Sequence, residues 1–120
     1  MKIPNEAITD CYKYSKEAYE NNLKSKDAAE RIVSKHNLKL SLSKDYFNYF
    51  KYLITGTGSC RSLSSYTQGY YLENINEEYS KEQFVKSLAA FKKLIEKFEG
   101  DKVGSKKVMK AIYEKYSKLV

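Results

Sequence analysis

The residues best placed to do chemistry lie in one short run, Gly56-Thr57-Gly58-Ser59-Cys60-Arg61-Ser62. Arg61 is the only charged residue of this run, and glycines and hydroxyl side chains surround it. A guanidinium can bind a phosphate or a base edge through two hydrogen bonds at once, and glycine lets backbone amides approach the same ligand. The run therefore predicts an anion-binding loop, formed by Gly56, Thr57, Gly58, Ser59, Arg61 and Ser62.

Catalytic and metal chemistry is not indicated by the remaining reactive residues. The single histidine, His36, provides no catalytic triad, and Cys11 and Cys60 are too far apart in sequence for zinc-ligand spacing. At the end of a predicted helix beside Lys35, His36 fits a solvated or helix-capping role. The central loop also lacks the Gly-Lys-Ser/Thr that makes a nucleotide-binding loop convincing. We expect no enzyme, no catalytic residue, no metal site and no cofactor, and we expect both cysteines to be free thiols.

Charge is the strongest compositional feature of this chain of 120 residues, whose net charge is +7. Its distribution is uneven: residues 24–61 carry +5, residues 62–79 carry −3 and residues 101–120 carry +4. A basic middle and a basic tail suit a polyanion, although a lysine-rich solvated surface is the alternative interpretation. No apolar run approaches the roughly 18 residues of a membrane span, and no apolar stretch of a signal peptide follows Lys2. We therefore expect a single cytoplasmic domain, residues 1–120, without a membrane partner.

Apolar residues recur at spacings of three and four along the whole chain, which predicts an all-α, compact bundle of about six helices. One proline and five glycines leave long runs without a helix breaker. The predicted helices are a first, capped by Asn5 and stopped by Asn21-Asn22; a second, capped by Ser25 and ended by Asn37; a third through Ile54, capped by Ser41 or Ser43; residues 65–79, capped by Ser62 or Ser64; a fifth opened by the capping box Ser80-Lys81-Glu82-Gln83 and closed by Gly100; and a sixth from Gly104-Ser105 to Leu119.

The inward faces of the last helices follow from the same spacing. In the fourth helix the core side is expected to be Tyr66, Tyr70, either Tyr71 or Leu72, and Ile75. Gly69 lies in the middle of that helix, where it costs ~1 kcal/mol relative to alanine, so we expect a neighbouring backbone to pack closely there. In the sixth helix the inward residues are expected to be Val108, Met109, Ile112, Tyr113, Tyr116 and Leu119.

The second and third predicted helices, joined by a short link, resemble a helix-turn-helix pair, whose second helix can enter a major groove. Any two short amphipathic helices look similar, so this is one interpretation of two. The exposed face of the third helix would be Lys44, Asp45, Asn48, Lys51 and Tyr52. We expect Lys44, Asn48 and Lys51 to read or position a duplex, and Lys106, Lys107 and Lys110 to add phosphate contacts.

Six of the twelve tyrosines flank the central loop, and they have two interpretations. Tyrosine fits the edge of a core, with its hydroxyl in water, and it also stacks on bases in proteins that bind single strands. We expect four of the six to be core residues. The six are Tyr46, Tyr49, Tyr52, Tyr66, Tyr70 and Tyr71.

The run from Tyr46 to Ile75 resembles a helical region found N-terminal to the nuclease domain in bacterial HNH-type restriction endonucleases and related uncharacterised proteins. In that family an aromatic helix ends in glycine, an arginine follows five residues later, and a hydroxyl residue and a Tyr-Tyr-Leu-Glu-x-Ile helix come next. The matching residues here are Gly56, Arg61, Ser62 and Tyr70-Tyr71-Leu72-Glu73-Asn74-Ile75. The later helix from Phe84 to Phe98 continues the similarity, which covers roughly residues 40 to 100.

Two departures from that family change what the resemblance implies. Ser59 stands where the family often has tyrosine, and a chain with one histidine cannot form a His-Asn-His nuclease motif. The resemblance therefore implies a recognition module without the cutting half, with DNA as the partner.

Three functions remain open from the sequence. The first is a non-catalytic nucleic-acid recognition module that binds DNA through the helix-turn-helix-like face and the loop around Arg61. The second is a protein-binding inhibitor of phage or mobile-element origin, an anti-defence protein that blocks a host nucleic-acid enzyme, with exposed tyrosines as interface anchors. The third is a small-ligand site at the central loop that binds a phosphate or a nucleotide.

Overall fold

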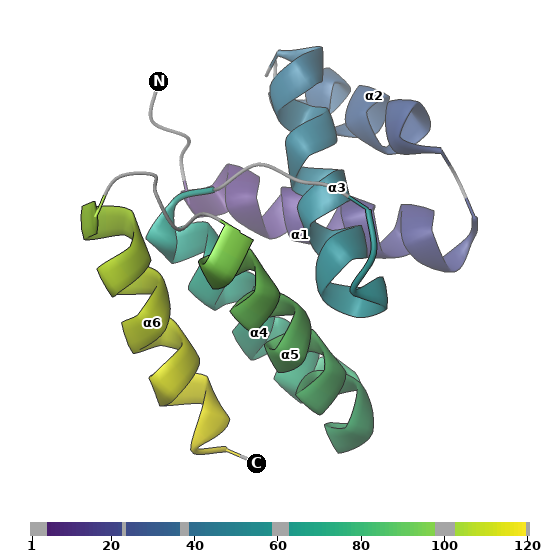
Figure 1. Ribbon diagram of the computed structural model, residues 1–120. Coiled ribbons are helices and arrows are strands. Elements are labelled where there is room, and N and C mark those ends of the chain that lie inside the picture. The colour runs from purple at the N-terminus through teal and green to yellow at the C-terminus, as the bar shows by residue number, and fades with distance from the viewer. Residues whose placement is uncertain (1–4, 23, 37–38, 59–62, 98–102, 120) are drawn as a thin grey trace. The chain divides into compact units, whose positions relative to one another are not determined.

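The computed structural model describes residues 5–22, 24–36, 39–58, 63–97 and 103–119, and within these ranges the regular elements are all α-helices. The predicted all-α class is therefore confirmed. Figure 1 shows the helices of the described chain in order. They are α1 (Asn5–Glu20), α2 (Ser25–His36), α3 (Leu40–Thr55), α4 (Ser65–Glu78), α5 (Lys81–Lys97) and α6 (Val103–Ser117).

Backbone contacts divide the chain into two compact units. The first unit contains α1, α2 and α3 as far as Tyr52, and the second contains the last turn of α3 together with α4, α5 and α6. The organisation of the chain as one domain stays a prediction. Each unit is described below by itself.

The core of the first unit is built around α1, which packs closely against α2. The predicted stripe of α1 is buried at Ala7, Ile8, Cys11, Tyr12 and Ala18. The ring of Phe50 on α3 receives two tyrosine edges from α1. Its centroid is 5.5 Å from that of Tyr12 and 6.0 Å from that of Tyr19. Such edge-to-face pairs stabilise a core beyond the area that they bury.

The start of α3 differs from the prediction. The helix begins at Leu40, so neither Ser41 nor Ser43 is its N-cap, and Ser43 is instead fully buried within the first turn. The backbone amide of Ser43 donates to the carbonyl of Lys39, which closes that turn. The helix therefore begins before either serine. The hydrogen bond from the Ser43 amide to the Lys39 carbonyl closes its first turn without a side-chain cap.

The second unit is a bundle of three helices in which α5 packs against both α4 and α6. Figure 1 shows α5 running in the opposite direction to α4, with α6 turning back again beside them. Short connections favour this antiparallel arrangement of neighbouring helices. The fully buried large side chains of this unit include Tyr71, Leu72, Ile75, Phe84, Phe91, Leu94 and Met109.

Polar caps position the ends of α4 and α5. The Ser64 hydroxyl accepts a hydrogen bond from the amide of Thr67 at 3.3 Å, so Ser64 is the N-cap of α4, one of the two predicted serines. The Ser80 hydroxyl accepts from the Gln83 amide at 3.1 Å, which is half of the predicted capping box. The side chain of Gln83 does not return to the cap but donates to the carbonyl of Ile54 at 3.1 Å. It therefore satisfies a carbonyl at the end of α3.

The inward face of α4 was predicted correctly at Tyr71 or Leu72 and at Ile75, but wrongly at Tyr66 and Tyr70. Its buried residues are Thr67, Gln68, Tyr71, Leu72 and Ile75, whereas Tyr66 is 46% exposed and Tyr70 is half-buried. Thr67 and Gln68 can occupy the core side because their side chains form hydrogen bonds with nearby groups. The Thr67 hydroxyl lies 2.8 Å from that of Ser64, and the side-chain amide of Gln68 donates to the carbonyl of Leu63 at 2.7 Å.

The inward face of α6 is narrower than predicted. Met109 and Tyr116 are buried, and Ile112 and Tyr113 are half-buried, but Val108 is 44% and Leu119 is 55% exposed. A helix in a three-helix bundle buries only the stripe that meets its two neighbours, so side chains at the border of the stripe stay in solvent. No helix among the described residues is long and apolar enough to cross a membrane.

Candidate functional site

The glycines of the central loop have the backbone conformation that their residue type predicts. Gly56 has φ +72° and Gly58 has φ +95°, backbone angles that residues other than glycine rarely adopt. The hydroxyl of Thr55 accepts hydrogen bonds from the Thr57 amide at 3.2 Å and from the Thr57 hydroxyl at 3.0 Å. The turn is therefore held by its own polar groups. Ser59, Cys60, Arg61 and Ser62 lie outside the described residues, so the predicted role of Arg61 stays a prediction.

The face of α3 that was predicted to contact DNA is only partly exposed. Lys44, Asn48 and Lys51 follow one another at spacings of four and three, which places them on one side of the helix. Lys51 is exposed, and Lys44 and Asn48 are half-buried. Tyr52 is only 7% exposed, so its inclusion in the exposed face was wrong.

The predicted phosphate contacts of α6 are exposed wherever their side chains are described. Lys107 and Lys110 lie one turn apart and both are exposed, as are Lys115 and Lys118 further along. The side chain of Lys106 lies outside the described residues, although its backbone belongs to α6. The α3 lysines belong to the first unit and the α6 lysines to the second.

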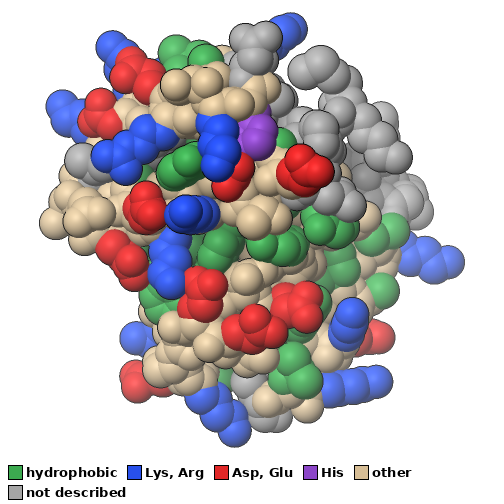
Figure 2. Space-filling view, turned by 180° about the vertical axis from the view of Figure 1, so that it is seen from behind, with side chains coloured by type: hydrophobic (Ala, Val, Ile, Leu, Met, Phe, Trp, Pro, Cys, Tyr) green, Lys and Arg blue, Asp and Glu red, His purple; other side chains and the backbone are tan. Residues whose placement is uncertain are grey.

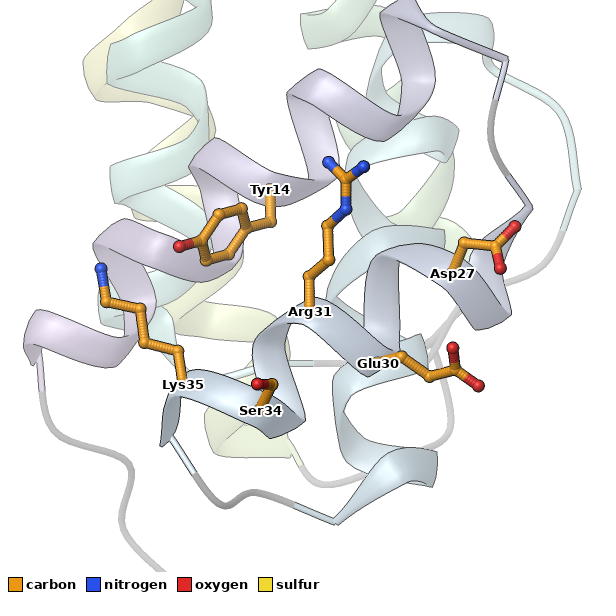
Figure 3. Close-up of a pocket in the computed structure, with 6 residues that line it drawn as sticks. All are labelled: Tyr14, Asp27, Glu30, Arg31, Ser34 and Lys35. Carbon is orange, nitrogen blue, oxygen red and sulfur yellow. The ribbon is translucent and has the colours of Figure 1, made fainter.

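A hollow of about 580 Å³ lies between α1 and α2, and charged side chains form part of its wall. Figure 3 shows Arg31 and Lys35 reaching toward α1 on either side of Tyr14, while the carboxylates of Asp27 and Glu30 point away from that ring. Arg31 already lies 3.7 Å from Glu17, and Lys35 lies 3.2 Å from Asp10. Since both cations meet a carboxylate, this hollow offers an anion little net positive charge.

Asp10 binds two side chains from the end of α2. Its Oδ2 atom is 2.6 Å from Nε2 of His36 and 3.2 Å from Nζ of Lys35. The hydrogen bond with His36, with a further contribution from Lys35, holds the pKa of the Asp10 carboxyl below 3.8. Figure 2 shows the histidine at the surface, with basic and acidic side chains beside it. His36 lies at the end of α2 as predicted, but it is only partly solvated, because its ring joins α2 to α1 through Asp10.

A groove of about 740 Å³ lies between α4 and α6 in the second unit. The rings of Tyr66 and Tyr70 stack beside it, with centroids 6.0 Å apart and planes inclined by 22°. Its two exposed large apolar side chains are Tyr66 and Val108. The lining residues are Ser65, Tyr66, Gly69, Tyr70 and Glu73 from α4, and Val108, Ile112, Lys115 and Tyr116 from α6.

The sequence did not predict this groove, because the spacing of apolar residues in α4 indicated core positions for Tyr66 and Tyr70. A signal was present: if Leu72 and Ile75 face inward, Gln68 must do so too, since it precedes Leu72 by four residues. That phase turns Tyr66 and Tyr70 outward. The number of core tyrosines was nevertheless predicted correctly, because Tyr46, Tyr49, Tyr52 and Tyr71 are the four buried residues of the six.

Comparisons of the chain with models of protein families, with curated proteins and with solved structures found no match. Within the described residues, no three histidine, cysteine, aspartate or glutamate side chains gather where they could hold a metal ion.

Proposed function

We propose that this protein is a non-catalytic nucleic-acid-binding module whose partner is DNA. The observation that carries this proposal is the run of lysines on α6, which presents Lys107 and Lys110 to solvent one turn apart, with Lys115 and Lys118 following. The sequence of α6 contains four lysines and one acid, Glu114. Exposed lysines at helical spacing bind phosphates, which supply most of the affinity of such proteins.

The α3 face and the central loop have complementary roles in this proposal. Lys44, Asn48 and Lys51 position the duplex, and Arg61 contacts a phosphate or a base edge with the amides of the loop around Gly56 and Gly58. The left-handed backbone of both glycines supports close approach of a ligand to the loop. The resemblance to the region preceding HNH nuclease domains points to the same partner.

Fluorescence anisotropy with a labelled DNA duplex of 20 base pairs tests the proposal. We expect the Lys107→Gln/Lys110→Gln variant to bind roughly tenfold more weakly at 100 mM salt, because each phosphate contact contributes through the release of counterions. Arg61→Ala should weaken binding as well, and it tests the contribution of the loop separately.

The matched control is Lys92→Gln/Lys93→Gln, which removes the same charge from two exposed lysines of α5 that the proposal leaves out. Its affinity should stay within about twofold of the wild type, apart from a general electrostatic effect. An equal loss of duplex affinity in both variants would mean that Lys107 and Lys110 act only through the general charge of a solvated surface. Absence of duplex binding by the wild-type protein would contradict the proposed function itself.

A further inference from the structure

The groove between α4 and α6 is not needed for phosphate binding by Lys107 and Lys110, and its lining is unusual for a solvent-exposed face. Tyr66 is 46% and Val108 is 44% exposed, so a large aromatic ring and a branched aliphatic side chain both meet water. Exposed apolar side chains around a concave surface mark a binding site more often than scattered single residues do. The chemistry of the lining identifies the ligand.

Tyr66 and Tyr70 form an aromatic stack before any ligand binds. Their ring planes differ by only 22°, and the centroids are 6.0 Å apart. A third planar group can extend such a stack by face-to-face contact. The stack therefore favours a flat, aromatic ligand over an aliphatic one.

Gly69 leaves space beside this stack. A Cβ atom added at this position would stand 3.8 Å from the Tyr116 hydroxyl, an ordinary contact distance, so glycine leaves the volume of that atom open. Ile112 of α6 also lines the groove. The groove is thus bounded by rings on α4 and by aliphatic carbon on α6, with a tyrosine hydroxyl between them.

Two charged residues, Glu73 and Lys115, also line the groove. Glu73 follows Tyr70 by one turn of α4, and it is exposed. Lys115 is exposed on α6, with its Nζ 5.3 Å from the centroid of the Tyr116 ring. A carboxylate accepts hydrogen bonds from the amino group of a base, and a lysine meets a phosphate. A phosphate alone would need neither the stacked rings nor Glu73, which would repel it.

We propose that the α4–α6 groove holds an unpaired base of a single-stranded nucleic acid, and that it favours bases with an exocyclic amino group. The base stacks on the Tyr66–Tyr70 pair, its amino group donates to Glu73, and Lys115 binds the adjoining phosphate. This inference rests on the proposed function, since it adds the class of strand to a nucleic-acid-binding protein. Paired bases in a duplex already have both faces covered, so the groove distinguishes unpaired from paired strands.

The test is fluorescence anisotropy with labelled dC12, dT12 and a 20-base-pair duplex at one salt concentration. We expect the wild-type protein to bind dC12 more tightly than dT12, because cytosine carries an exocyclic amino group and thymine does not. Tyr66→Leu keeps apolar bulk but removes the ring, and it should weaken dC12 binding roughly tenfold while duplex binding stays unchanged. Tyr66→Phe keeps the ring and should bind dC12 as the wild type does.

Glu73→Gln tests the specificity of the groove. An amide side chain can both donate and accept, so this variant should lose the preference for dC12 over dT12 and retain its duplex affinity. Addition of cytidine monophosphate at millimolar concentration, followed by thermal melting, separates a free nucleotide from a strand as the ligand. A shift in melting temperature without dC12 binding would assign the groove to a nucleotide and overturn the strand proposal.

Other outcomes separate this inference from the proposed function. If Tyr66→Leu leaves dC12 binding unchanged while Lys107→Gln/Lys110→Gln weakens it, strand binding is electrostatic and the groove is not its site. If the wild type binds neither dC12 nor duplex, the proposed function has failed as well. A labelled nona-arginine peptide tests for a protein partner. If the wild type binds this peptide but not DNA, and Glu73→Gln no longer binds the peptide, the groove binds a protein and the proposal is overturned.

Discussion

Asp10 on α1 accepts hydrogen bonds from His36 and Lys35 at the end of α2, and it thereby connects the two helices. The carboxylate is 17% exposed, so water screens these bonds only in part. Hydrogen bonds that involve a charged group are shorter and stronger than neutral ones. Asp10 therefore contributes more to the stability of the first unit than its position at the surface of α1 suggests.

Asp10→Asn should lower the free energy of unfolding by ~1 kcal/mol at pH 7, since it removes the charge from these hydrogen bonds. The folded pKa of Asp10 lies below its ordinary value of 3.8, so the stabilisation is present above about pH 4 and is lost as pH falls through the folded pKa. Urea unfolding at pH 7 and at pH 3 should thus show the variant and the wild type converging in acid. Glu96→Gln, at an exposed position of α5, is the control and should change little.

Cys11 is a second residue whose behaviour its environment determines. Its side chain is fully buried, and this burial, assisted by the nearby negative charge of Asp10, raises the pKa of the thiol to about 12. In a Cys60→Ser variant, which leaves Cys11 as the one cysteine, a thiol reagent at pH 8 should react at least a hundredfold more slowly with the folded than with the urea-unfolded protein. Similar rates in both states would contradict the burial of Cys11.

At the scale of the element, α4 shows how local hydrogen bonds decide which face of a helix is buried. Ser64 caps the helix and also lies 2.8 Å from the Thr67 hydroxyl, and Gln68 bonds to the carbonyl of Leu63. These bonds make it inexpensive to bury two polar side chains. The tyrosines on the other face then line the groove shared with α6.

Gly69→Ala should stabilise the protein by up to ~1 kcal/mol, because alanine favours the helix and restricts the unfolded chain. The sequence predicted a closely packed backbone at this position, whereas the nearest atom to an added Cβ is the Tyr116 hydroxyl, at an ordinary contact distance of 3.8 Å. Thermal and urea unfolding measure the change. Destabilisation by this substitution would mean that α4 and α6 approach more closely than the structure shows.

At the scale of the whole molecule, the net charge of +7 matters more than any single lysine. Basic residues are exposed on α3, α5 and α6, whereas α4 carries acids and no base. A net positive charge favours long-range attraction of polyanions in general, and salt weakens that attraction.

The affinity for duplex DNA should fall roughly 40-fold between 50 and 200 mM salt if three phosphates are contacted. Removal of one contacting lysine, for example by Lys110→Gln, should lower the slope of log affinity against log salt by ~1. Lys86→Gln is a suitable control, because Lys86 lies 4.0 Å from Glu82 on the same helix. A slope of zero for the wild type would exclude phosphate contacts as the source of affinity.

Much of this architecture follows from the sequence alone. The spacing of apolar residues predicts the helical class, and Ser64, Ser80 and the asparagines after Glu20 mark helix ends within one or two residues. Asn22 has φ +56°, a conformation that asparagine tolerates better than most residues. Such signals are readable because they depend on neighbours three or four positions away along the chain.

Tertiary structure decided which partner each side chain meets. The bond between Asp10 and His36 joins residues 26 positions apart, and that between Gln83 and Ile54 joins residues 29 apart, so no local pattern contains them. The same is true of the groove, since Tyr66 and Tyr70 become a site only where Val108 and Lys115 of α6 pack beside them. The sequence by itself determined helices, caps and charge through short-range physics, and the packing of those helices determined which polar and aromatic groups face one another.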